Sequence, residues 1–501
     1  MSSAMKNCFL AIDLGASSGR AIIGEFDGSR ITLEEIHRFP NDPVRVNGTL
    51  YWDVLRLMHE IRQGIRKAKP YQISGIGIDT WGVDFGLLDA SGRLLANPVH
   101  YRDTRTHGTL KQAEAVLPQD ALYDATGNQI MEINTLFQLL AMKQQQPELL
   151  ANAKQLLLMP DLFAYFLTGR IACDRSIAST TQLYDPRQKD WAVSVADSYG
   201  LNRSFLPEIQ DCGTLRGMLS AELCEELQMQ PVPVYAVCGH DTQSALAAVP
   251  AEEAEFAFLS CGTWSLLGTE LHAPVLTGEA RAAAFTNESA FGNKTAFLKN
   301  LTGLWIMQQS LREYEQNGQK FNYNEMLAAA QQAAPFRSLI DTEHPRFAAD
   351  HGILQGIAAF CSETGQPAPE TPGAVFRCIT ESLALQYRAA LEALQSVTKR
   401  TYPRLYVIGG GARNPMLMQM TADLCGIPVY ACDAEATALG NIAVQIYAAG
   451  ALQSIGEVRA VCRASQKVTC FEPDLQNRQQ GGEIYQKYRA QICGAGKELS
   501  C

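Results

Sequence analysis

The sequence predicts an α/β protein with two domains, and three observations support this prediction. Short apolar segments typical of buried strands alternate with amphipathic helical segments along the chain, as in folds that layer helices on a sheet. An apolar strand, a loop of small residues and a second apolar strand occur at residues 9–26 and again at 256–271. The chain has 501 residues, which is more than a single hydrophobic core usually serves.

Composition places the chain among ordinary globular proteins. Hydrophobic residues make up 47% and charged residues 19% of it, which excludes disordered and fibrous classes. The net charge of −10 argues against a nucleic-acid or anionic-membrane surface and favours small polar substrates. The 14 cysteines lack C-x-x-C spacing, so we expect a reducing cytoplasm, with Cys361 and Cys378 as two buried thiols. No segment has the pattern of a membrane span or a signal peptide.

The first strand–loop–strand segment contains two candidate sites. Its loop, Gly15 to Gly19, satisfies the G-x-S-x-G pattern of a serine nucleophile elbow, in which the serine stands between a strand and a helix. The residues that follow, "RAIIGEF", are typical of a second strand instead. We therefore interpret the loop as a hairpin turn whose N–H groups and hydroxyls hold phosphate. Asp13 ends the first strand and is placed to hold Mg²⁺, directly or through water, although an Asp there can also merely cap the turn.

Two helices are predicted from apolar stripes at helical spacing. The stripes consist of Leu55, Met58, Ile61 and Ile65, and of Ile133, Leu136, Phe137 and Leu140. Residues 73–79 and 405–411 are apolar runs that end in Asp or Gly, as buried parallel strands do where a site opens at their carboxyl ends. The three glycines at 409–411 indicate a close backbone approach, which suits either a tight strand-to-helix turn or a nucleotide contact.

A candidate sugar site follows the strand at 73–79. The segment "IDTWGVDFGLLD" predicts a strand that turns at Thr80-Trp81-Gly82 into another strand. A Trp ring face, a glycine backbone and the Asp84 carboxylate suit a sugar, although a Trp in such a turn often only packs. Arg102 and Asp103, in "YRDTRT", are further candidates for polyol hydroxyls.

The strongest local signal is "VCGHDTQSALAAV", where a strand leads through Gly239 into a helix that opens with His240, Asp241 and Thr242. A carboxylate at a helix start is often only an N-cap. Here three different polar side chains follow a strand end in an α/β chain, which is where such folds build sites. Asp241 is therefore a candidate general base that accepts a hydroxyl proton during phosphoryl transfer.

The repeated hairpin suggests two related domains, each of which offers a phosphate loop to a cleft. The Pro and three acidic residues within 247–256 interrupt the apolar pattern, so we divide the chain into domains 1–248 and 249–501. Other nucleotide and metal motifs are missing from the sequence. It contains no G-x-x-x-x-G-K-[ST], which excludes a P-loop, and no H-E-x-x-H or clustered Cys/His pattern that would support zinc.

The motifs in their order resemble the FGGY carbohydrate kinases over nearly the whole chain. The matching stretches are "AIDLGASSGR", "GIDTWGVDFGLLD", "YRDTRT", "MPDLFAYFLTGR", "GHDTQSA", "LSCGTWSL", "LKNLTGLWIMQ" and "IGGGARN". The resemblance implies two actin-like (ribonuclease H-like) domains, with ATP, Mg²⁺ and sugar bound in the interdomain cleft. It also implies transfer of phosphate from ATP to a hydroxyl of a ketose.

Carried over position by position, the resemblance implies two sets of binding residues. The residues implied to contact ATP are Ala16, Ser17, Ser18, Gly19, Arg20, Thr263, Gln308 and Gly410. Those implied to contact the sugar are Gly82, His240, Asp241, Thr242 and Asn300, with Asp241 as the base. The first domain would hold most of the sugar site and the first phosphate loop, and the second domain the other phosphate loop and the adenosine. The expected partners are a ketose and ATP, without nucleic acid or membrane, and the oligomeric state, monomer or dimer, stays open.

Two other classes compete with a ketose kinase. A serine hydrolase built on Gly15 to Gly19 requires a helix after the loop, which the sequence does not favour. A non-catalytic ATP-binding switch of the same fold would leave His240, Asp241 and Asn300 without a purpose. A kinase of another ketose or of a polyol differs from the leading prediction only in its acceptor.

Overall fold

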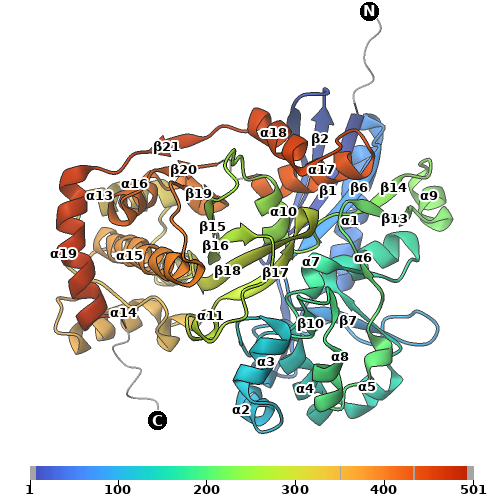
Figure 1. The fold of residues 1–501 in the computed structure, drawn as a ribbon, viewed down its shortest axis with the longest axis horizontal. Coiled ribbons are helices and arrows are strands. Elements are labelled where there is room, and N and C mark those ends of the chain that lie inside the picture. Colours follow the sequence, from blue (N-terminus) through green and yellow to red (C-terminus); the bar gives the residue numbers. More distant parts are fainter. Residues whose placement is uncertain (1–6, 350, 433–434, 494–501) are drawn as a thin grey trace, which may run out of the picture. The chain divides into compact units, whose positions relative to one another are not determined.

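The computed structural model describes residues 7–349, 351–432 and 435–493, and it divides the chain into two compact units (Figure 1). The first unit comprises Met1–Glu252, Glu270–Phe297 and Glu435–Gln466, and the second comprises Glu253–Thr269, Leu298–Ala434 and Lys467–Cys501. Each unit is therefore assembled from segments that lie far apart in the sequence. Across the described ranges, no helix combines the length and the apolar character that crossing a membrane would require.

A six-stranded sheet, counted over the described residues, forms the centre of the first unit. In spatial order its strands are β13 (Thr214–Met218), β14 (Pro233–Ala236), β6 (Gly75–Thr80), β1 (Asn7–Leu14), β2 (Ser18–Phe26) and β3 (Ile31–Pro40). Strand β1 pairs antiparallel with β2 and parallel with β6, while β14 pairs parallel with β6 and antiparallel with β13. The predicted hairpin at residues 9–26 is confirmed, and the strand predicted at 73–79 is β6.

Helices cover both faces of this sheet, which explains why its central strands are apolar throughout. On one face, α1 (Val54–Ala68) shares a core with Ile76 and Ile78 of β6. On the other face, α17 (Ala436–Ala448) packs against β1 and β6. Gly77 alternates with these two isoleucines and so points toward α17, where a Cβ atom would come within 2.4 Å of Asn441 Oδ1.

Both predicted helices form, but each apolar stripe is partly wrong. Helix α1 begins at Val54, after Asp53 caps its N-terminus, and Val54 is buried whereas Leu55 is 69% exposed. One residue turns a helix by about 100°, so this start places Val54 in phase with Met58 and leaves Leu55 outside the stripe. In α4 (Thr135–Gln145), Leu136 and Phe137 are buried, but Ile133 precedes the helix and Leu140 is half-buried.

The first unit also contains short strands and further helices. The strands are β4 (Val44–Val46), β5 (Thr49–Tyr51), β7 (Phe85–Leu88), β8 (Gln155–Leu158), β9 (Cys173–Asp174), β10 (Tyr184–Asp185), β11 (Asp190–Trp191), β12 (Ile209–Gln210) and β17 (Thr286–Ala290). The helices are α2 (Thr109–Glu114), α3 (Gln119–Thr126), α5 (Pro147–Asn152), α6 (Met159–Thr168), α7 (Arg175–Ala178), α8 (Val193–Ser198), α9 (Ala221–Leu227), α10 (Asp241–Ala247), α11 (Gly278–Ala282) and α18 (Ile455–Ser465). Strand β7 pairs with β8 and not with β6, so the turn at residues 80–82 connects two different sheets.

The second unit repeats the strand arrangement of the first. Its sheet contains β15 (Ala257–Cys261), β16 (Trp264–Leu271), β18 (Lys294–Thr302), β19 (Leu405–Ile408), β20 (Val429–Ala431) and β21 (Thr469–Phe471). Strand β17 pairs with β18 at the edge of this sheet, and β16 and β18 cross the boundary of the units in sequence. Within it, β15 pairs antiparallel with β16 and parallel with β19, followed by a parallel β20 and an antiparallel β21. The order β2-β1-β6-β14-β13 thus has the same directions as β16-β15-β19-β20-β21. The predicted second hairpin and the repetition are confirmed.

In the sequence, the helices of the second unit lie between and after the strands of its sheet. They are α12 (Trp305–Gln316), α13 (Tyr323–Gln332), α14 (Ile353–Glu363), α15 (Pro372–Thr398), α16 (Pro415–Cys425) and α19 (Leu475–Gln491). The longest, α15, packs against α13 and α16 and buries Tyr387 completely. Cys361 of α14 and Cys378 of α15 are both buried free thiols, as predicted.

Candidate active site

The turn between β1 and β2 is a tight loop held by its own backbone. The Gly15 N–H donates to Ser18 O at 2.9 Å, and Asn41 holds the loop from outside through its side chain on Gly15 O (2.8 Å) and its N–H on Ser17 O (3.2 Å). Ser17 is exposed at the tip, and strand β2, not a helix, follows it. The turn therefore lacks the strand-to-helix geometry of a nucleophile elbow.

Gly19 and Arg20 differ from the exposed residues of this loop. Gly19 is buried, and a Cβ atom there would lie 2.3 Å from the Phe39 ring, so its missing side chain lets β2 pack. Arg20 stands opposite Asp13 in the hairpin register and contacts its Oδ2 at 2.5 Å. Its guanidinium also forms an ion pair with Glu435. Burial alone would lower the pKa of Arg20, but the carboxylates of Asp13 and Glu435 raise it. Glu435 was missed because it lies just before α17, hundreds of residues along the chain.

Asp79 is the second residue that the sequence reasoning missed. It ends the apolar run of β6, stands beside Asp13 in the parallel register and has no exposed surface. Asn441 of α17 donates to its Oδ2 at 2.5 Å, while its buried Oδ1 has no hydrogen-bond partner. Burial, and the nearby charges of Asp13 and Asp241, raise the pKa of Asp79 well above the ordinary value. The signal was present in the sequence, because an Asp closing a buried strand marks the same sheet edge as Asp13.

The segment from Gly239 to Thr242 joins this sheet edge. The Thr80 N–H donates to Gly239 O at 2.9 Å, and the Gly239 N–H donates to the buried Asp174 carboxylate at 2.9 Å. Helix α10 begins at Asp241 and its N-cap position is His240, so Asp241 is the first helical residue and not the cap. The Asp241 side chain is 29% exposed, and Thr242 Oγ1 donates to its Oδ1 at 3.2 Å. Burial raises the pKa of Asp241.

His240 connects Asp241 to a carboxylate on another strand. Its Nδ1 lies 2.8 Å from Glu288 Oε2, and its Nε2 lies 3.6 Å from Asp241 Oδ1. Gln243 also donates to Glu288 Oε2 at 2.8 Å. Burial would lower the pKa of His240, but Glu288 raises it, so the imidazole retains its proton to higher pH. Glu288 was missed because β17 carries it 48 residues away, with no motif around it.

Of the predicted sugar residues near Trp81, Gly82 is half-buried, whereas Trp81 itself and Asp84 are buried. Gly82 is half-buried, and a Cβ atom there would touch Thr180 at 3.2 Å, so its backbone lies close to a hydroxyl-bearing neighbour. Trp81 is buried against the Trp52 ring, with ring centroids 4.0 Å apart. Asp84 has no exposed surface. It accepts hydrogen bonds from Trp52 Nε1, Trp81 Nε1, Tyr101 N and Gln138 Nε2 at 2.6, 2.9, 3.2 and 2.9 Å.

Sugar recognition by the Trp81 face and the Asp84 carboxylate is therefore wrong, since protein groups already occupy both. Asp103 is also 4% exposed and accepts from the Leu50 and Arg105 N–H groups, so it stabilises its own loop. Burial raises the pKa of Asp84 to about 6, because the charged form is costly despite its donors.

The remaining predicted residues belong to the second unit. Thr263 stands in the turn between β15 and β16, and its Oγ1 contacts Oε1 of Gln308 on α12 at 3.4 Å. The Gly262 O of the same turn accepts from the Leu304 N–H at 2.8 Å, which fixes the start of α12 beside the turn. Asn300 lies on β18, half-buried. The structure thus brings Thr263 and Gln308 together.

The glycines after β19 have different roles. Gly409 has φ +86°, and Cβ atoms at Gly409 and Gly411 would approach Cys261 O and Sγ at 2.8 and 2.1 Å, so these two pack against β15. Gly410 is exposed, and a Cβ there would meet nothing within 4 Å. Of the three glycines, only Gly410 is exposed, and it is also the one that the resemblance selected.

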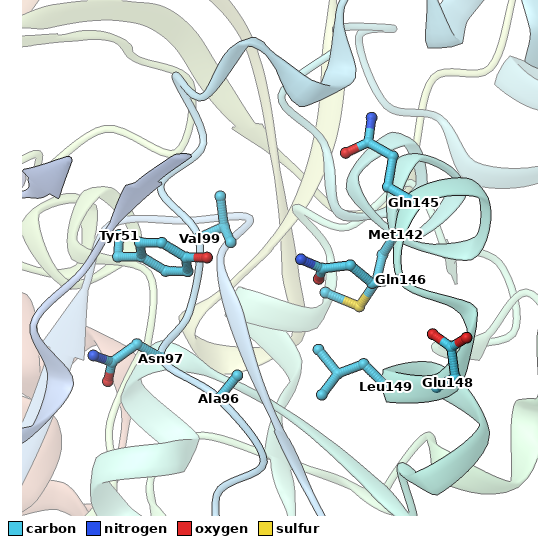
Figure 2. Close-up of a pocket in the computed structure, with 9 residues that line it drawn as sticks. All are labelled: Tyr51, Ala96, Asn97, Val99, Met142, Gln145, Gln146, Glu148 and Leu149. Atoms are coloured by element: carbon cyan, nitrogen blue, oxygen red, sulfur yellow. The ribbon is translucent and has the colours of Figure 1, made fainter. Parts of the chain in front are cut away.

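A separate surface pocket of about 390 Å³ lies in the first unit (Figure 2). Tyr51 and Val99 stand across it from Met142 and Gln146, which come from the end of α4 and the segment after it. None of the sequence-predicted site residues lines this pocket. It therefore does not contribute to the site described above.

Comparison with known proteins places the chain in one family. Models of the N-terminal and C-terminal domains of the FGGY family of carbohydrate kinases match residues 8–248 and 257–449. The chain is 40% identical to a rhamnulokinase of Bacteroides thetaiotaomicron over 94% of this chain and 96% of that protein. It is 38% identical to a rhamnulokinase of Enterococcus faecalis over 92% of this chain and 93% of that protein.

Solved structures share the fold at low sequence identity. A ligand-bound xylulose kinase from Lactobacillus acidophilus superposes with a TM-score of 0.80 at 13% identity, covering 99% of both chains. Glycerol kinase from Plasmodium falciparum with ADP superposes with a TM-score of 0.77 at 18% identity, covering 97% of this chain and 98% of that one. The two-domain α/β fold and the matched domain models agree, and the chain belongs to the FGGY family of carbohydrate kinases.

Proposed function

We propose that the protein phosphorylates L-rhamnulose at O1, using ATP, to give L-rhamnulose 1-phosphate and ADP. Family membership supplies the sugar kinase activity. The observation that carries the choice of sugar is the 37–40% identity to curated rhamnulokinases over 92–94% of this chain. Fuculose, xylulose or a polyol as acceptor is the alternative, and a non-catalytic ATP-binding switch is a weaker one.

Asp241 is proposed to accept the proton of the attacking hydroxyl. Its carboxylate is partly exposed at the start of α10, and it carries no N-cap role that would explain it structurally. His240 next to it, held by Glu288, supplies when protonated a positive charge that favours the ionised base. In phosphoryl transfer the attacking hydroxyl loses its proton late, so a base of modest strength suffices.

The ATP residues are proposed in two sets, one in each unit. In the first unit, Ala16 to Ser18 offer N–H groups and hydroxyls at an exposed turn, while Gly19 and Arg20 support the turn through packing and the Asp13 ion pair. In the second unit, Thr263 and Gln308 form one contact group and the exposed Gly410 backbone another. The proposed sugar residues Gly82, His240, Asp241 and Thr242 belong to the first unit, and Asn300 belongs to the second. The boundary between residues 248 and 249 likewise remains a proposal.

The carboxylates beside β1 fit a Mg²⁺ ion. The nearby charges of Asp13 and Asp241 raise the pKa of Asp79, whose buried Oδ1 lacks a hydrogen-bond partner, and a divalent cation would relieve this repulsion. The described residues contain no group of three or more such side chains with metal-ligand geometry. Mg²⁺ in kinases uses one or two carboxylates together with water and phosphate oxygens, so Asp13 remains the proposed ligand. When bound, the ion would neutralise charge on the transferring phosphate.

An ADP-release assay tests the proposal. The purified protein is supplied with ATP and Mg²⁺ and with L-rhamnulose, L-fuculose, D-xylulose or glycerol in parallel reactions. We expect the highest kcat/KM with L-rhamnulose. Higher kcat/KM with another acceptor would assign the protein to a different branch of the family. ATP binding without turnover of any acceptor would favour the switch.

A further inference from the structure

Two thiols meet directly before the segment that carries the proposed base. Cys212 Sγ and Cys238 Sγ lie 3.6 Å apart, and Cys238 precedes His240 by two residues. The last pair of the β13–β14 ladder at this end is Thr214 opposite Ala236. Cys212 and Cys238 lie two residues beyond that pair on each strand, in the position of a cross-strand pair. Directly opposite residues of an antiparallel pair have Cβ atoms about 4.5–5.5 Å apart, and a disulfide needs about 3.5–4.5 Å, so bridging these thiols requires a small approach of the two segments.

The two thiols differ in access. Cys238 is fully buried, whereas Cys212 is half-buried and lines a cavity of about 580 Å³ in the first unit. Arg175, Asp211 and Glu288 also line this cavity, so charged groups border the space that Cys212 reaches. The hydrogen bond to Cys212, together with burial, raises the pKa of the Cys238 thiol. A dissolved oxidant would therefore reach Cys212 first.

We propose that Cys212 and Cys238 form a redox-sensitive pair, which peroxide converts to a disulfide that displaces the proposed base segment and slows the kinase. The effect on rate rests on the proposed role of Asp241. In the first step, Cys212 thiol reacts with hydrogen peroxide to give a sulfenic acid and water. In the second step, the Cys238 sulfur attacks the Cys212 sulfur, the S–O bond breaks, and water leaves with the Cys238 proton.

The disulfide requires a movement that the surrounding contacts would transmit. The sulfur atoms must approach from 3.6 Å to about 2.05 Å. Cys238 and the residue after it are held in place, because the Cys238 O accepts from Ser244 Oγ at 2.8 Å and Gly239 is hydrogen-bonded to Asp174 and Thr80. A displacement of Cys238 would therefore also displace His240 and Asp241, because a short, hydrogen-bonded backbone segment joins them. Misplacement of a reacting group by about 1 Å can cost roughly 10²-fold in rate.

The test measures the bond and the rate separately. The full-length protein is reduced, exposed to hydrogen peroxide, alkylated and digested, and the Cys212–Cys238 cross-linked peptide is quantified by mass spectrometry. Hydrogen exchange of residues 237–244 and kcat with L-rhamnulose are measured on the same samples, before and after dithiothreitol. We expect the cross-link, altered exchange in that segment, and a kcat lower by about ten- to a hundredfold that dithiothreitol restores.

Cys212→Ser is the test variant, and Cys470→Ser, which removes an exposed thiol of the second unit, is the matched control. Cys212→Ser should keep its rate after peroxide, while Cys470→Ser should lose it as the wild type does. Absence of the cross-link, a cross-link without change in exchange or rate, or equal loss in Cys212→Ser would each overturn the proposal. If the untreated protein does not phosphorylate L-rhamnulose, the proposed function fails, and the cross-link and exchange data still decide the thiol pair.

Discussion

At the level of single residues, the site consists of charged groups that hold one another in defined states. Asp241 and His240 were predicted because they follow a strand end in one short motif. Asp79, Glu288 and Glu435 were not, because each acquires its importance only from a partner that folding brings next to it. A local pattern can therefore predict a candidate site residue, but not the buried residues that set its charge.

Asp241→Asn tests the proposed base. The amide keeps the size of the side chain and removes the proton acceptor, so kcat should fall by roughly 10²–10⁴-fold, the usual contribution of a general base. The affinity for ATP, measured by calorimetry, should change little, because the residues proposed to bind ATP are others. Asp13→Asn serves as the comparison, since it should also raise the Mg²⁺ concentration needed for half-maximal rate. Wild-type kcat in folded Asp241→Asn would refute the base.

Glu288→Gln tests whether Glu288 positions and charges His240. Without the carboxylate, burial dominates and the pKa of His240 falls, so the imidazole loses its proton at lower pH and the alkaline limb of the pH–rate profile moves to lower pH. The loss of this positive charge also removes an interaction that lowers the pKa of Asp241, so the acidic limb moves to higher pH. The kcat/KM profile should therefore narrow from both sides.

Glu270→Gln is the control for this experiment. Glu270 is also a buried carboxylate of the first unit, but it pairs with Arg459 and not with His240. Its variant can lower stability, which a thermal melt would show, without narrowing the pH–rate profile. An unchanged profile in Glu288→Gln would mean that Glu288 only packs against His240.

At the level of elements, patterns of small and apolar residues predicted both hairpins, the strands β6 and β19, and the helix that starts at Asp241. The partners of a strand were harder to predict. The sequence predicts that β6 turns at residues 80–82 into another strand, and β7 does form there, yet it pairs with β8, which is about 70 residues further along the chain. The predicted buried face of α1 was partly wrong for a related reason. The residue at which α1 starts depends on the Asp53 cap and not on the apolar residues alone.

A pair of variants separates the roles of two residues in the first hairpin. Ser17→Ala removes one exposed hydroxyl but leaves the loop N–H groups in place, so the kinase should remain measurable, with a loss of about 0.5–3 kcal/mol in phosphate binding. Gly19→Ala should be more harmful, because the new methyl group would meet the Phe39 ring at 2.3 Å and disturb the packing of β2. Thermal melting and the KM for ATP report the two effects. Complete inactivity of a folded Ser17→Ala protein would instead support the interpretation of Ser17 as a catalytic nucleophile.

At the level of the whole molecule, the repeated hairpin in the sequence corresponds to two sheets with the same strand order and directions. The sequence could predict this repetition because each hairpin has its own local pattern. It could not predict that residues 270–297 and 435–466 belong with the first unit, since no turn or composition change marks a chain that leaves a unit and returns. Long-range packing alone decides such membership.

The residues proposed to bind one ATP molecule are divided between these two units, which has a consequence for motion. A ligand contacted by both units lowers the free energy of conformations in which both reach it, so binding should shift the population toward them. We expect the radius of gyration from small-angle X-ray scattering to fall when L-rhamnulose and a non-hydrolysable ATP analogue with Mg²⁺ are both present, because closure excludes water from the reacting groups. Sugar alone should have a smaller effect, since most of its proposed residues lie in the first unit. An unchanged radius at saturating concentrations of both ligands, verified by calorimetry, would show that the units do not close on the nucleotide, and the assignment of Thr263, Gln308 and Gly410 to ATP would have to be withdrawn.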